Sequence, residues 1–160
     1  MKSYALIKFL NKCLLLIKKL KPKSHKFTLT EDTQFDVLGL STAFNDYRLA
    51  WELNTCLDMR ITLHEEQLEI YESKTKETSF FRVYHFFDEE NLTKYYIIKN
   101  KQNFKFLLPE KSAFDYFLLI RDNFIFEMSD FTTRLRQING IVAVFTIANS
   151  EFELAEHLTF

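Results

Sequence analysis

The chain is poor in the residues that make tight turns and cross-links: its 160 residues include only 2 Gly, 2 Pro and 2 Cys. Few turns can therefore use glycine to reach a positive φ angle, so Asn and Asp are expected to form many of them. Cys13 and Cys56 share no motif spacing, and a chain of this length can bury a conventional core without disulfides. These observations favour a reducing, cytoplasmic location.

Long apolar runs are missing too. No stretch approaches the roughly 20 apolar residues of a membrane-spanning helix. Lys8 and Asn11 interrupt the apolar residues near the start, where the core of a secretion signal would be continuous. We therefore expect no membrane span and no secretion signal.

Known catalytic and cofactor motifs are likewise missing. The His residues are scattered, and His64-Glu65-Glu66 lacks the second His that a zinc-binding helix requires. Two Gly residues cannot build a phosphate-binding loop, and neither a G-x-S-x-G motif nor a Cys and His nucleophile signature is present. The sequence predicts no catalytic residue, no metal site and no cofactor.

Charge is distributed unevenly along the chain. Eight of the 21 basic residues precede the first acidic residue, Glu31, so the remaining 13 stand against all 22 acidic residues. An acidic domain repels phosphate backbones unless Lys and Arg gather locally. This distribution disfavours nucleic-acid binding by the body of the protein.

Residues 1–22 have a character of their own. From Leu6 to Leu20 apolar residues recur at helical spacing and most lysines lie off that stripe, which indicates a basic amphipathic helix before the Lys21-Pro22 linker. Such a leader packs on the domain, contacts a membrane surface peripherally, binds a partner such as RNA, or is translated sequence upstream of the true start. We favour packing, because amphipathic stripes usually serve it.

Residues 23–160 are expected to form a single α+β domain. Strands are predicted at residues 26–30, 35–40, 67–71, 79–87, 92–99, 103–108, 113–121 and 141–147, and helices at 41–57 and 129–140. Polar turns between the central strands imply antiparallel neighbours. The expected architecture is a mostly antiparallel sheet, a meander, with two helices packed on one face, plus the N-terminal amphipathic helix.

Three polar residues are expected to face the interior. Alternation along residues 113–121 places Asp115 beside apolar neighbours, so its carboxylate needs partners, and the backbone N–H groups of residues 110–112 are the nearest. On the first helix, Asp46 and Asn54 fall within the core-facing arc, to which Tyr47, Ala50, Leu53 and Leu57 are assigned. Asp46, Asn54 and Asp115 are therefore a candidate buried polar cluster, for which a structural role is favoured over a functional one.

One motif stands out: Leu108-Pro109-Glu110, three further residues, then Phe114-Asp115-Tyr116. It closely resembles the signature of the bacterial IPExxxVDY family, with Leu108 in place of Ile and Phe114 in place of Val. The segments Leu38-Gly39-Leu40 and 46–49 are also similar to that family, so the resemblance covers the chain from about His25 onwards. The family has no assigned activity, so the resemblance implies no catalytic residue, and it leaves the basic leader outside the shared domain.

These observations leave three functional hypotheses. The leading one is a small cytoplasmic, non-enzymatic module that binds a protein partner, because catalytic motifs are missing and the sheet is rich in aromatic residues. The second is an RNA-associated accessory protein that uses the basic leader. The third is an enzyme with an acidic site formed by Asp46, Asn54, Glu110 and Asp115, which requires these side chains to meet in one cleft around a carboxylate of raised pKa.

Overall fold

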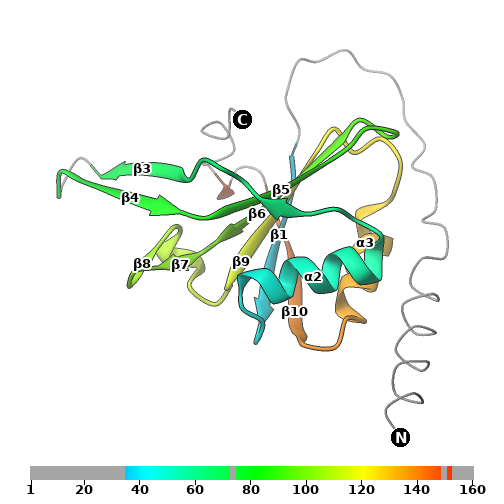
Figure 1. Cartoon of the computed structure of the whole chain (residues 1–160). Coiled ribbons are helices and arrows are strands. Elements are labelled where there is room, and N and C mark those ends of the chain that lie inside the picture. Colours follow the sequence, from blue (N-terminus) through cyan, green and yellow to red (C-terminus); the bar gives the residue numbers. More distant parts are fainter. Residues whose placement is uncertain (1–34, 73–74, 149–150, 153–160) are drawn as a thin grey trace, which may run out of the picture.

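The computed structural model describes residues 35–72, 75–148 and 151–152, which form a mixed α+β fold (Figure 1). The amphipathic helix expected in residues 1–22 and the strand expected at 26–30 lie outside the described residues. None of the helices in the described part of the chain is long and apolar enough to cross a membrane.

The described elements follow the predicted order, with differences at their ends. They are β1 (Phe35–Thr42), α2 (Asp46–Leu57), β2 (Thr62–Leu63), β3 (Leu68–Glu72), β4 (Glu77–Phe81), β5 (Val83–Asp88), β6 (Thr93–Lys99), β7 (Lys101–Gln102), β8 (Lys105–Phe106), the 3-10 turn η1 (Pro109–Lys111), β9 (Tyr116–Arg121), α3 (Met128–Arg136) and β10 (Ile141–Ile147). The strand predicted at 79–87 divides at Arg82, because β4 pairs with β3 whereas β5 joins the main sheet. The strand predicted at 103–108 is replaced by the small β7–β8 hairpin.

Six strands form the main sheet in the order β10-β1-β9-β6-β5-β2, and every neighbouring pair is antiparallel. Strands β5, β6 and β9 are consecutive neighbours, as a meander requires. Strand β1 is different, since it lies between β9 and β10, the last two strands of the described chain. The sheet is therefore antiparallel as predicted, but a simple meander describes only its middle.

Both helices connect strands that point the same way within this sheet. Four antiparallel pairings separate β1 from β2, joined through α2, and two separate β9 from β10, joined through α3. The crossover through α2 starts from β1 and runs toward β2, whereas the crossover through α3 starts from the antiparallel strand β9 and runs the other way, toward β10. Such crossovers are right-handed in nearly all proteins. Because both the strand direction and the direction of travel are reversed between the two, the same hand places both helices over the same face of the sheet.

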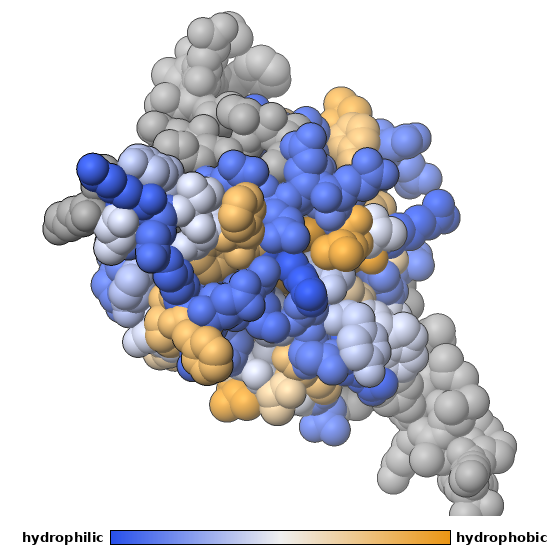
Figure 2. Space-filling view, turned by 60° about the vertical axis from the view of Figure 1, so that its left-hand side comes forward, coloured by the Kyte–Doolittle hydropathy of each residue, from blue (hydrophilic) through white to orange (hydrophobic). Residues whose placement is uncertain are grey.

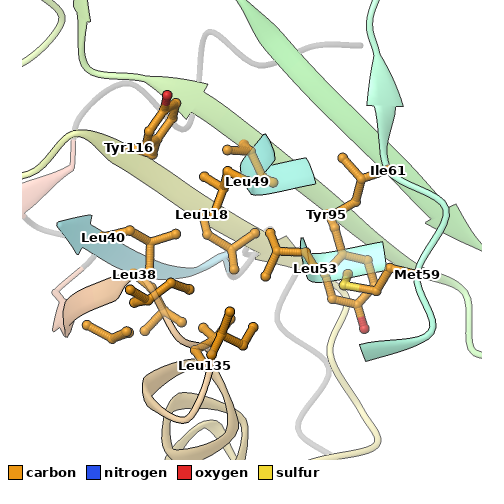
Figure 3. Close-up of a cluster of buried hydrophobic side chains, with 14 of the residues drawn as sticks. Leu38, Leu40, Leu49, Leu53, Met59, Ile61, Tyr95, Tyr116, Leu118 and Leu135 are labelled. Atoms are coloured by element: carbon orange, nitrogen blue, oxygen red, sulfur yellow. The ribbon is translucent and has the colours of Figure 1, made fainter. Parts of the chain in front are cut away.

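Buried side chains form one cluster on each face of the sheet. On the helix face, residues of α2 and α3 pack with sheet residues that include Leu38, Leu40 and Leu118 (Figure 3). On the opposite face, the cluster contains residues of β1, β3, β4, β6 and β9, with Phe152. Strand β9 supplies both clusters, Tyr116, Leu118 and Ile120 to one and Phe117 and Leu119 to the other, which explains its uninterrupted apolar run.

The inner face of α2 agrees with the prediction for Asp46, Ala50 and Leu53 but not for Tyr47. Its buried residues are Asp46, Leu49, Ala50, Glu52, Leu53 and Cys56. Tyr47, assigned from the sequence to the core, is 69% exposed. The side chain of Asn45, not Ser41 or Thr42, caps the helix by accepting a hydrogen bond from the Arg48 N–H at 3.1 Å. Asp46 faces inward, as predicted, and reaches partners on the sheet.

Candidate functional site

The motif segment is fastened by a residue that the sequence did not single out, Asn100. Its side chain is fully buried, and its Oδ1 accepts a hydrogen bond from the Leu108 N–H at 3.0 Å. Its Nδ2 donates to the carbonyl groups of Lys111 at 3.1 Å and Phe114 at 2.8 Å. Asn100 therefore holds the start, the middle and the end of the turn that contains η1.

Phe114 and Asp115 attach the motif to the end of β1. The Phe114 ring covers Gly39, where an added Cβ would lie 2.7 Å from the ring, so the position has no room for a larger side chain unless that ring moves. The Asp115 carboxylate accepts a hydrogen bond from the Thr42 N–H at 2.8 Å. The partners predicted in residues 110–112 are not used, because the irregular pairing between Ser41 and Thr42 turns this N–H toward Asp115.

Tyr116 connects the motif to the first residue of α2. Its hydroxyl donates to Asp46 Oδ1 at 3.0 Å, beside Lys99 Nζ at 2.6 Å from the same oxygen. Arg82 Nη1 lies 3.2 Å from Asp46 Oδ2. We call these four residues the Asp46 cluster. Figure 3 shows Tyr116 at one end of the buried leucines, with its hydroxyl directed away from them.

The charges and hydrogen bonds of the Asp46 cluster shift the pKa values of Asp46 and Tyr116 in opposite directions. Burial by itself would raise the pKa of Asp46, but the hydrogen bonds from Lys99, Tyr116 and Arg82 and the charge of Lys99 outweigh it, so the pKa is lowered. Burial and the negative charge of Asp46 raise the pKa of Tyr116. Asp46 is thus ionised and Tyr116 protonated at neutral pH, an arrangement suited to holding elements together and poorly suited to proton transfer.

The other two residues of the candidate polar cluster, Asn54 and Asp115, make hydrogen bonds to partners different from those of Asp46. Asn54 exchanges two hydrogen bonds with the backbone of Ile61, at 3.0 and 2.7 Å, and so fastens the loop after α2. Asp115 is exposed, which corrects the expectation of a buried carboxylate, and Glu110 is exposed on η1. Among the described residues, Asp46, Asn54 and Asp115 therefore share no hydrogen-bond partner, and the pKa of Asp46 is lowered, whereas the enzyme hypothesis requires a raised one.

Two of the histidines, His64 and His85, lie next to each other. The rings of His64 and His85 lie edge to face with centroids 4.7 Å apart. Burial and the neighbouring His64 lower the pKa of His85. Among the residues that the structure describes, no group of three or more His, Cys, Asp or Glu side chains is placed to hold a metal ion.

The exposed side of α2 carries a compact group of aromatic and cationic side chains. Tyr47 is 69% and Trp51 45% exposed. The Arg48 guanidinium lies 4.4 Å from the centre of the Trp51 ring and 5.9 Å from that of Phe44. It also pairs with the buried Glu52, whose Oε1 is 2.5 Å from Arg48 Nη2. We call Phe44, Tyr47, Arg48 and Trp51 the α2 surface.

Sequence reasoning missed the α2 surface because it placed Tyr47, which is exposed, in the core. The inward position of Asp46 was a usable signal. A helix that turns this residue to the sheet must turn its neighbour Tyr47 away from the centre of that face.

Comparison with models of protein families, with curated proteins and with solved structures gives no significant match to this chain. The candidate site is therefore defined by the chain's own residues.

Proposed function

We propose that this protein is a small cytoplasmic, non-enzymatic module that binds a protein partner through the α2 surface. The exposure of Trp51 and Tyr47 together with Arg48 is the observation that carries the proposal. These three residue types are the ones most enriched where protein interfaces gain their binding energy. Trp51 is the single Trp of the chain, and it is nearly half exposed.

The α2 surface is held in a fixed arrangement before any partner binds. Arg48 is kept in place by Glu52 and by the Trp51 ring. The opposite side of α2 is packed in the core, and Asp46 ties its first turn to the sheet. Side chains ordered in advance lose less conformational entropy on binding, which favours affinity.

The charges beside the α2 surface favour an acidic partner. The side chains of Arg48, Arg82 and Lys99 are 46%, 54% and 33% exposed. Their carboxylate partners, on Asp46 and Glu52, are only 6% and 4% exposed. The local surface thus presents cations and hides the anions beneath them, so it complements a partner that combines acidic and apolar side chains.

Other exposed apolar residues are scattered. Figure 2, which brings forward the side of the molecule with the β3–β4 hairpin, shows hydrophobic residues in separate patches among hydrophilic ones. Phe104, at 97%, is an exposed aromatic residue beside the β7–β8 hairpin, away from α2 in the sequence and in the fold. It supplies a matched control for the α2 surface.

The motif on which the family resemblance rests also has a part in this proposal, because it positions α2. The contacts of Phe114 with Gly39 and of Tyr116 with Asp46 join the three segments on which the resemblance rests. In such a family the motif would be conserved to hold the start of α2 in place. Its residues would then support the docking surface without touching the partner.

Co-purification with and without ribonuclease tests the function. The full-length tagged chain, Trp51→Ala and Phe104→Ala are expressed in the source organism, and bound proteins are identified by mass spectrometry. We expect a partner that survives ribonuclease, is lost with Trp51→Ala and is kept with Phe104→Ala. A partner set unchanged by Trp51→Ala contradicts the proposal.

The RNA hypothesis has a separate outcome in the same experiment. Aromatic and cationic side chains also stack on bases and bind phosphates, and the basic leader lies outside the described residues. Partners lost on ribonuclease treatment and on deletion of residues 1–22 would move the assignment to RNA. Flotation of the same deletion with liposomes tests peripheral membrane contact by the leader.

A further inference from the structure

A cavity lies on the helix face of the sheet, at the end opposite Tyr116. It is bordered by the end of α2, the β5–β6 hairpin, the loop before α3 and α3 itself. Four aromatic rings line it, those of Phe86, Tyr95, Phe126 and Phe131. Figure 3 shows Tyr95 beside Met59, which also lines the cavity.

The size of the cavity limits what it can hold. Its volume is about 150 Å³. A cavity of roughly this volume with apolar walls accommodates a benzene ring. The occupant is therefore limited to one ring, or an aliphatic group of the same size, with a small polar substituent.

The rings of the cavity wall hold each other in place. Phe86 and Tyr95 are stacked with centroids 5.7 Å apart, and Phe126 and Phe131 are stacked at 4.9 Å. Tyr95 and Phe131 join the two pairs across 6.4 Å. Such interlocked rings keep the wall open instead of letting it collapse around a void.

Two hydrogen-bond donors on this wall lack protein partners. Tyr95 is only 6% exposed, yet its hydroxyl makes no hydrogen bond to any residue that the structure describes. Arg134 lines the same cavity, and among the described residues its guanidinium makes no ion pair, although the negative charge of Asp130, one turn earlier on α3, acts on it. Neither donor belongs to the fully buried side-chain atoms that lack a partner, and Arg134 is only half-buried, so water satisfies both until a ligand offers an acceptor.

The two carboxylates that line the cavity, those of Asp58 and Asp88, make no hydrogen bond to Tyr95 or Arg134. Asp88 is occupied by its own turn, where its oxygens accept hydrogen bonds from the Glu90 and Asn91 N–H groups and from Asn91 Nδ2. Asp58, at the end of α2, is exposed to solvent at the rim. Tyr95 and Arg134 are the donors open to an acceptor on the ligand, while Asp58 and Asp88 also line the cavity and the negative charge of Asp88 acts on Tyr95.

We propose that this cavity binds a small aromatic monocarboxylate, with its ring among Phe86, Phe126 and Phe131 and its carboxylate accepting hydrogen bonds from Tyr95 and Arg134. A guanidinium is the side chain best shaped for a carboxylate. The site is separate from the α2 surface and does not depend on the function proposed for it.

Titration with three probes of matched size tests the charge of the ligand. Benzoate, benzyl alcohol and benzylamine are added to the full-length protein, and amide and methyl chemical shifts are followed by NMR. Benzoate is expected to shift residues of the cavity and to bind about tenfold more tightly than benzyl alcohol, because it adds a charged hydrogen-bond pair. Tighter binding of benzylamine, or no shift in the cavity with any probe, overturns the proposal.

Two variants test the donors. Arg134→Gln should remove the preference for benzoate over benzyl alcohol, whereas Arg136→Gln, which removes the same charge from the same helix outside the cavity, should keep it. Tyr95→Phe keeps the ring and should weaken benzoate about threefold while leaving the fold intact, since the hydroxyl has no protein partner to lose. Benzoate affinity that is unchanged in both Arg134→Gln and Tyr95→Phe overturns the proposal.

Discussion

Asp46 ties the first turn of α2 to the ends of several strands. Lys99 ends β6, Tyr116 begins β9 and Arg82 separates β4 from β5, and all three reach the same carboxylate. The position at the start of a helix favours the negative charge further. Because burial alone would raise the pKa of Asp46, its lowered pKa shows that these partners more than offset the cost of removing the carboxylate from water.

Asp46→Asn should lower the free energy of unfolding by about 2 kcal/mol at pH 7, a value below that of a fully buried pair because Lys99 and Arg82 remain partly in solvent. The folded-state pKa of Asp46 lies below its unfolded value. The stabilisation is therefore complete above the unfolded pKa, about 3.9, and is lost as the pH falls through the folded value. Urea unfolding at pH 7 and pH 3 should show a difference between wild type and variant that narrows in acid.

Glu77→Gln is the control for this measurement. Its ion pair with Lys105 lies on the surface, so its urea midpoint should stay close to that of the wild type. A loss of stability in Asp46→Asn that is the same at both pH values would contradict a role for the charge.

At the scale of single residues the sequence predicted Asp46 better than its partners. Helical spacing placed it inward. Its partners lie 53 positions away for Lys99, 36 for Arg82 and 70 for Tyr116. Pairing over such separations depends on sheet register, which no local pattern specifies. Turn residues were predicted in part, since Asp58, Asn103 and Asp122 have positive φ angles, but so do Leu92 and Phe104.

Among the elements, the contact of β1 with the motif turn depends on a missing side chain. Gly39 pairs with Phe117 on one neighbour and with Phe145 on the other, so its strand is enclosed on both edges. The Phe114 ring occupies the space above it. A larger residue at position 39 cannot move sideways and must displace that ring.

Gly39→Ala is therefore expected to destabilise the protein by about 1–3 kcal/mol, the usual cost of overpacking a filled site. Thermal or urea unfolding measures it. Phe114→Leu should relieve the contact, so the double variant Gly39→Ala with Phe114→Leu should lose less stability than the two single changes added together. Strict additivity would show that the ring does not cause the loss.

Individual elements were largely predictable from the sequence, and their assembly was less so. The strand predicted at 141–147 coincides with β10, and residues 92–99 differ from β6 by one residue. On α2 the apolar pattern placed Tyr47 inward, although it is exposed, because an aromatic side chain reads as a core residue whether it is buried or lies at an interface. The division at Arg82 was missed since β4 and β5 look continuous until their different partners are known.

In the whole molecule, protection should be greatest in β1 and β9. Strands β1 and β9 are neighbours and are packed on both faces. The edges are short or covered: β2 has two residues, and Arg136 Nη2 donates to the Val144 carbonyl of β10 at 2.6 Å. The β3–β4 hairpin extends away from the body of the fold (Figure 1).

Hydrogen exchange followed by NMR should reflect this arrangement. Amides of β1 and β9 should exchange only through global unfolding, whereas those of β3, β4, β7 and β8 should exchange earlier through local opening. Equal protection in the β3–β4 hairpin and in β1 would contradict this ranking, and so would faster exchange in β1 than in β6.

The position of β1 between β9 and β10 also determines when the sheet can form in the cell. A ribosome makes β1 before any other described strand, but its two neighbours, β9 and β10, are completed only with residues 116–147. Until then a largely apolar strand has no partner on either side. The domain therefore cannot assemble piece by piece as it is translated. Completion of the sheet waits until β10 has been made, and until then β1 is open to pairing with other chains.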